Sequence, residues 1–131
     1  MKKDLLVIGG GPAGISAARF AKMTNPSLEV ALIRTTPLAV IPCAIPYSFG
    51  ETVPKDSIVI PDSMITGVGV DLIVDVVVEV KDRLAILQSG RKIEFDKLIL
   101  ATGSEPIAPP IAGADSENVF CIKDMRSLVR V

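Results

Sequence analysis

The sequence lacks histidine altogether and has only two cysteines, Cys43 and Cys121. Without histidine, the usual zinc sites and the triads built on serine or cysteine are excluded. Two cysteines far apart along the chain indicate neither a disulfide framework nor a metal-ligand pair, so we expect a reducing, cytoplasmic setting. Any proton transfer has to use a carboxylate, a thiol, Lys, Tyr or a bound cofactor.

The sequence also lacks an excess of charge of either sign. It has 14 basic and 15 acidic residues, a net charge of −1, so we expect no nucleic-acid partner. The longest apolar run without charge, residues 5–18, contains four glycines and a proline, and we expect no membrane partner either. A chain of 131 residues that is 49% hydrophobic suits one compact globular domain or part of one.

The first 34 residues have the pattern of a βαβ unit. Residues 4–10 are a run of Leu, Val and Ile that ends in glycines, which is typical of a strand buried on both faces of a parallel sheet. Residues 12–25 favour a helix, with proline tolerated at its first turn and Asn25-Pro26 at its end. Residues 28–34 predict the next strand, parallel to the first.

The rest of the chain predicts loops and then β-structure. Residues 35–66 are rich in proline, so we expect loops and one helix around 47–50 rather than sheet. The β-rich runs 69–80, 83–89 and 91–102 predict a small antiparallel meander that leads into a core strand at 97–101, and 118–122 is a further strand-like run. The predicted fold class is α/β, a Rossmann-like parallel sheet with an inserted antiparallel meander.

A glycine-rich loop joins the first strand to the first helix. Gly9, Gly11 and Gly14 fit G-x-G-x-x-G, in which the first glycine allows a tight turn, the second lets the backbone approach a pyrophosphate and the third lets helix and strand pack closely. The helix N-terminus then faces the phosphates. Since the loop lies between a buried strand and a helix, we interpret it as a dinucleotide site rather than a structural turn.

The acidic residue that usually ends the second strand and binds a ribose hydroxyl is absent. Arg34 stands there, and a guanidinium cannot accept a hydrogen bond. Three readings remain open: Arg34 lies over the adenine face, it binds a 2′-phosphate as in NADP sites, or it is a solvated strand end.

Three motifs in order, GGGPAG, PCAIPY and FDKLILATGSEPIAPPIAG, resemble the FAD-dependent pyridine nucleotide-disulfide oxidoreductases. The likeness is to the single-cysteine branch that holds NADH oxidases, NADH peroxidases and coenzyme A-disulfide reductases. It implies FAD as cofactor, NAD(P)H as reductant, a homodimer, and Cys43 as the redox cysteine beside the flavin. It also implies that residues 1–113 are part of an incomplete FAD-binding domain and that 114–131 lead toward a separate NAD(P)H-binding domain.

The resemblance also assigns site residues. Tyr47 is the candidate substrate-binding residue, and Ala39-Val40 stand where the family often has Ser-Phe. The cofactor-binding set implied by the motifs is Gly9, Gly10, Gly11, Pro12, Ala13, Gly14, Arg34, Thr35, Pro42, Val77, Val78, Ala101, Thr102 and Gly103.

The implied chemistry runs from NAD(P)H through FAD to Cys43, and then to a disulfide such as coenzyme A disulfide, a polysulfide, or oxygen or peroxide. A second cysteine is missing near Cys43, so its oxidised form would be a mixed disulfide or a sulfenic acid. Two alternatives stay open: a non-catalytic adenine-dinucleotide-binding module in which Cys43 only packs, and a plain NADP-binding oxidoreductase domain. We expect Cys121 to pack in the core.

Overall fold

The computed structural model describes residues 1–51 and 53–123 of the chain, which divide into two compact units. The first unit comprises residues 1–37 and 60–103, and the second comprises 38–59 together with the described residues from 104 onward. Each unit is described by itself below. Among the described residues, no helix is long and apolar enough to cross a membrane.

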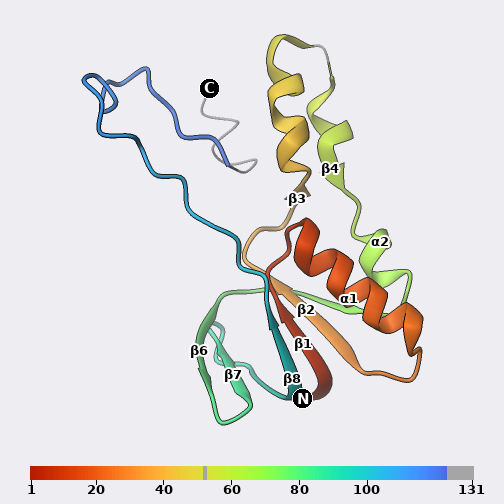
Figure 1. Cartoon of the computed structure of the whole chain (residues 1–131). Coiled ribbons are helices and arrows are strands. Elements are labelled where there is room, and N and C mark those ends of the chain that lie inside the picture. Colours follow the sequence, from red (N-terminus) through yellow and green to blue (C-terminus); the bar gives the residue numbers. More distant parts are fainter. Residues whose placement is uncertain (52, 124–131) are drawn as a thin grey trace. The chain divides into compact units, whose positions relative to one another are not determined.

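The first unit is a six-stranded sheet whose strand order is β5-β2-β1-β8-β7-β6 (Figure 1). The strands β1, β2, β5 and β8 run parallel, and β7 is antiparallel to both β8 and β6. The helix α1 lies against β1, β2 and β8. The element bounds are β1 Lys2–Ile8, α1 Pro12–Thr24, β2 Val30–Arg34, α2 Ser63–Thr66, β5 Asp71–Val74, β6 Val77–Lys81, β7 Leu84–Leu87 and β8 Lys92–Leu100.

The core explains why the parallel strands are apolar throughout. Side chains alternate across a strand, so Leu6 and Ile33 point to one face, while Val7 and Leu32 point to the other, which α1 contacts. On the face of Leu6, Ala85 and Leu87 of β7 and Phe95 of β8 join it in one hydrophobic cluster. Both faces are therefore covered, and the predicted α/β sheet with an antiparallel meander is confirmed.

Residues 69–80 form two strands rather than the one predicted run. The strand β5 pairs parallel with β2, the chain turns at residues 75–76, and β6 then pairs antiparallel with β7. The predicted turns at 81–82 and 89–90 are confirmed, and Asp82 and Gly90 have positive φ angles there. The predicted core strand at 97–101 is the second half of β8, whose first half pairs with β7.

The second unit holds the proline-rich segment. It contains β3 Ala39–Val40, the 3₁₀ helices η1 Pro42–Glu51 and η2 Lys55–Ile58, and the first residue of β4 Val59–Ile60. The expectation of loops without sheet was wrong, because β3 pairs with β4. The predicted helix at 47–50 exists but begins earlier, at Pro42. Residues 118–122 are not a strand, so that prediction was also wrong.

A buried lysine joins β1 to β5 and to the segment before β2, at the edge of the sheet where β1 begins. Lys3 is only 6% exposed, and its Nζ lies 2.8 Å from Glu29 Oε2 and 2.6 Å from Asp71 Oδ2. Burial by itself lowers the pKa of Lys3, but the hydrogen bonds and charges of Asp71 and Glu29 outweigh it, so the pKa is raised. The ion pairs therefore stabilise the folded sheet.

Replacing Lys3 with Met should lower the free energy of unfolding by about 1 to 2 kcal/mol, since both carboxylates lose a charged partner but remain largely exposed. Because the folded pKa is raised, this stabilisation is fully present below the unfolded value of 10.5 and is lost as the pH rises through the folded pKa. Urea unfolding between pH 7 and 11 measures both effects. Lys2→Met is the matched control, and equal losses in the two variants would contradict the assignment.

Candidate functional site

The glycine loop is fixed by contacts of backbone with backbone. Gly9 has φ +124, and a Cβ added to it would lie 2.0 Å from the carbonyl oxygen of Ala101. A Cβ on Gly14 would lie 1.9 Å from the carbonyl oxygen of Gly9. Neither position can accept a side chain, so β1, β8 and α1 meet as closely as backbones allow. Gly9 and Gly14 are therefore explained by chain packing alone.

Gly11 is different, because packing does not explain it. Its φ of −80 and ψ of 178 are open to any residue, and a Cβ there would meet no atom of the described chain within 4 Å. Gly11 is the N-cap of α1, and no side chain among the described residues caps that helix or places an acidic group in its first turn. The open space beside uncapped N–H groups fits a diphosphate.

The loop brings together predicted residues that are far apart in the sequence. The N–H of Ala101 donates to the carbonyl of Ile8 at 2.8 Å, which places the Ala101-Thr102-Gly103 motif beside Gly9. Pro12 and Ala13 are exposed on the first turn of α1, and Thr102 and Gly103 are exposed beyond β8. These predicted cofactor residues of the first unit therefore lie at one edge of the sheet, where the parallel strands end.

Arg34 ends β2 and is buried, so the reading of a solvated strand end was wrong. Its side chain is only 2% exposed. A Cβ added to Gly10 would lie 2.4 Å from the Cβ of Arg34, so the Arg34 side chain occupies the space beside Gly10. Its Nη2 donates to the carbonyl of Pro37 and pairs with Asp62, 2.8 Å from Oδ1. Asp62 is a residue that the sequence analysis did not select. Thr35, which follows, is exposed.

The predicted adenine-contacting segment begins beside Arg34. The N–H of Asp75 donates to the carbonyl of Arg34 at 2.9 Å, and this places the start of β6 next to the end of β2. Val77 is half-buried against the core, whereas Val78 is 59% exposed in a bulge where the pairing with β7 shifts. The Oγ of Ser89 donates to Asp75 at 2.5 Å, and this hydrogen bond lowers the pKa of Asp75. A residue in a bulge has backbone groups that are not used in the regular hydrogen bonding between strands. The backbone of Val78 can therefore contact a ligand such as adenine.

Cys43 and Tyr47 lie in the second unit, on η1. This helix packs through Ile45, which joins Val40 and Ile58 in a small core, and Ser48 is buried beside it with its Oγ donating to the Ile45 carbonyl at 2.7 Å. In a 3₁₀ helix, residues three apart share a face, so Cys43 shares its exposed face with Phe49.

The thiol of Cys43 is exposed in the structure and is not buried as the packing interpretation expects. The redox role of Cys43 stays a prediction. Pro42 and Tyr47 are exposed as well, Tyr47 to 63%. Cys121 is also exposed, and the prediction that it packs in the core was wrong. Ala39 and Val40, where the family often has Ser-Phe, are buried in β3.

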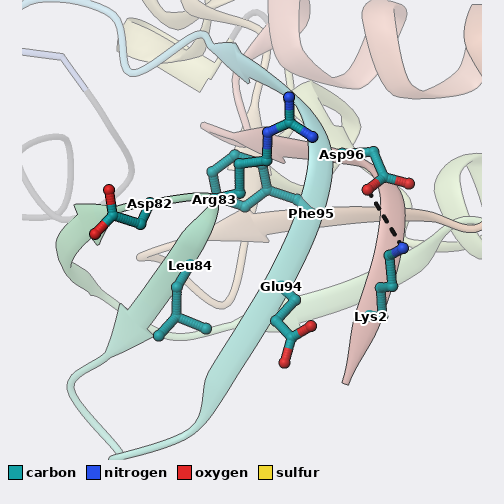
Figure 2. A pocket seen from close by; sticks show the side chains of 7 residues that line it. All are labelled: Lys2, Asp82, Arg83, Leu84, Glu94, Phe95 and Asp96. Carbon is teal, nitrogen blue, oxygen red and sulfur yellow. Dashed lines mark ion pairs between the residues drawn. The ribbon is translucent and has the colours of Figure 1, made fainter.

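The part of the chain that the structure describes shows no cluster of acidic or cysteine residues suited to a metal ion. A pocket at the other edge of the sheet, where β1 begins, is lined by residues of β1, β7, β8 and the β6–β7 turn (Figure 2). Lys2 and Asp96 form an ion pair of 3.4 Å there. None of the predicted site residues lines this pocket.

A sequence profile of the family described as pyridine nucleotide-disulphide oxidoreductase matches residues 3–130. The NAD(P)H sulfur oxidoreductase (CoA-dependent) of Pyrococcus abyssi is 33% identical over 127 residues, 92% of this chain and 28% of that protein. The NADH oxidase of Methanocaldococcus jannaschii is 30% identical over 139 residues, 95% of this chain and 31% of that protein. The solved sulfide:quinone oxidoreductase of Aquifex aeolicus has a TM-score of 0.83 at 27% identity, over 98% of this chain and 30% of that chain.

The chain spans less than a third of the length of these curated relatives. Within that span, the glycine loop, the Ala-Thr-Gly motif and the sheet that joins them confirm the predicted family and fold. The chain belongs to the pyridine nucleotide-disulphide oxidoreductases, a family of FAD-dependent enzymes that take NAD(P)H as reductant.

Proposed function

We propose that the protein of this chain binds FAD at the glycine loop and uses Cys43 to reduce a disulfide or polysulfide with electrons from NAD(P)H. The observation that supports FAD binding is the open space beside Gly11. Packing within the chain does not explain why this position is a glycine. The printed names of the relatives, an NAD(P)H sulfur oxidoreductase and an NADH oxidase, support the same class of reaction, with sulfur or oxygen as acceptor.

The residues around Gly11 fit the diphosphate of FAD. Pro12 has no N–H, so the free donors of the first turn come from Ala13 and Gly14, and no described side chain competes for them. The Gly103 position, with φ +75 and no atom of the described residues near its missing Cβ, leaves further room at the same edge of the sheet. We propose that these backbone groups hold the diphosphate and that the bulged Val78 contacts the adenine.

Bound FAD supplies the transfer of two electrons from NAD(P)H, which no side chain of this sequence can perform. The Cys43 thiolate attacks one sulfur of a substrate R–S–S–R, which forms a mixed disulfide and releases one RS⁻. Two electrons from the reductant then cleave this bond, restore the thiolate and release the second RS⁻. The balance is one disulfide, one NAD(P)H and one proton consumed for two thiols and one NAD(P)⁺.

The exposure of Cys43 supports this step, because a thiolate must be accessible to attack a substrate. Tyr47, exposed on the same 3₁₀ helix, is the proposed substrate contact. We further propose that the protein acts as a homodimer, that residues 1–113 belong to the FAD-binding domain, and that 114–131 lead to the NAD(P)H-binding part, as the family resemblance implies.

Replacing Gly11 with Val should weaken FAD binding at least about tenfold, equivalent to about 1.4 kcal/mol, because the new side chain fills the space of the diphosphate. The fold should be unaffected, since the backbone angles of Gly11 suit any residue. Flavin fluorescence during titration measures the affinity, and urea unfolding checks the fold. A Gly11→Val protein that binds FAD as tightly as the wild type would contradict the proposed site.

Replacing Cys43 with Ser should lower disulfide reductase activity by at least about 10³-fold, because the nucleophile is lost. The flavin absorbance should remain, because Cys43 lies outside the proposed FAD-binding loop. Cys121→Ser is the matched control and should keep full activity. Reductase assays on the intact protein with coenzyme A disulfide and polysulfide measure the effect, and a Cys43→Ser protein with undiminished activity toward both would exclude the cysteine mechanism.

A further inference from the structure

We infer that Asp62, held in place by Arg34, supplies the carboxylate that accepts hydrogen bonds from the adenosine ribose of FAD. This inference rests on the proposed function. It names a residue for the ribose-binding role that an acidic residue at the end of β2 usually has. Dinucleotide-binding folds usually place that carboxylate at the end of the second strand. Here the position is Arg34, and the acidic group comes from a segment 28 residues further on.

The carboxylate of Asp62 contacts Arg34 and does not cap the helix that Asp62 begins. Asp62 is the N-cap residue of α2, where aspartate commonly accepts a backbone hydrogen bond, yet its side chain caps no N–H within the described residues. Both carboxylate oxygens instead contact Arg34 Nη2, at 2.8 and 3.0 Å. The Asp62 side chain remains 52% exposed, so the carboxylate keeps room to accept further hydrogen bonds.

Arg34 has unused donors at the same place. Its Nε and Nη1 are buried and have no hydrogen-bond partner among residues 1–51 and 53–123. A buried donor without an acceptor destabilises a fold, so an ion pair serving stability alone would not be expected to leave two of them. The pair therefore presents an exposed carboxylate with free acceptor capacity, held in place by a guanidinium that is itself buried.

This combination suits a ribose hydroxyl and opposes a 2′-phosphate. A ribose hydroxyl can donate a hydrogen bond to the exposed carboxylate of Asp62. A 2′-phosphate offers acceptors only, and the negative charge of Asp62 would repel it. The structure thus favours a ligand with free ribose hydroxyls, such as the AMP half of FAD, over an NADP-type ligand.

The pair also lies where the adenosine half of a dinucleotide on the glycine loop would reach. The Arg34 side chain packs directly against Gly10, and Cδ lies 2.8 Å from the position of a Gly10 Cβ. The hydrogen bond from Asp75 to the Arg34 carbonyl joins the same point to the segment that leads to Val78. Loop, ion pair and adenine-contacting segment are thus continuous within the first unit.

The test is a titration of the intact protein, freed of flavin, with FAD, followed by competition with ADP-ribose and with 2′-phospho-ADP-ribose. Asp62→Asn should weaken FAD binding about tenfold, as expected for the loss of one hydrogen bond to a charged group. It should also reduce the preference for ADP-ribose over its 2′-phosphorylated form. Asp82→Asn, an exposed aspartate in the β6–β7 turn with a positive φ that asparagine accepts, is the matched control and should change neither value.

A double variant, Arg34→Glu with Asp62→Ala, returns a carboxylate to the end of β2 and should recover the FAD affinity that Asp62→Ala alone loses. The preference between the two ADP-ribose forms is a ratio within one protein, so loss of folded material does not change it. An unchanged preference in Asp62→Asn, with or without weaker FAD binding, would overturn the inference. A wild-type protein that takes up no FAD would overturn the proposed function together with the inference. A wild-type protein that binds FAD, with an unchanged preference in Asp62→Asn, would overturn only the role of Asp62.

Discussion

The close approach of three backbones at the end of β1 governs the rest of the structure. Gly9 lies so near Ala101, and Gly14 so near Gly9, that a single added methyl group at either glycine would push β1, β8 and α1 apart. This contact fixes where α1 begins and therefore where its free N–H groups point. It also sets the spacing between β1 and its neighbours β2 and β8, which carry Arg34 and the Ala-Thr-Gly motif.

Much of the fold was predictable because its signals are local. The run of apolar residues in β1, the glycines after it and Pro12 at the helix start each specify one element through backbone chemistry. The division of residues 69–80 was not predictable in this way. Whether a valine-rich run forms one strand or two depends on pairing with β2 and β7, which are distant in sequence. The same holds for β3, a two-residue strand that exists only through its pairing with β4.

The residues of the candidate site also differ in whether a local sequence signal identifies them. The glycine loop and Cys43 stand in recognisable local motifs, so the sequence was sufficient to select them. Asp62 stands in none: it follows Pro61 in a proline-rich segment and differs in no visible way from other surface aspartates. Only the contact with the buried Arg34 distinguishes it. An arginine where an acceptor is expected was the one available signal, because a buried guanidinium requires a carboxylate nearby.

The strand β8 joins the two kinds of sheet, since it is parallel to β1 over most of its length and antiparallel to β7 at its start. In this pairing Lys2 lies opposite Glu94, a residue far from it in the sequence. During synthesis, β1 emerges first but lacks one neighbour until the chain has grown past residue 100. Such long-range pairing slows folding and leaves an unpaired apolar edge exposed in the meantime. The nascent chain therefore passes through a stage in which the strand before the glycine loop is open to pairing with other chains, and the sheet closes only when β8 arrives.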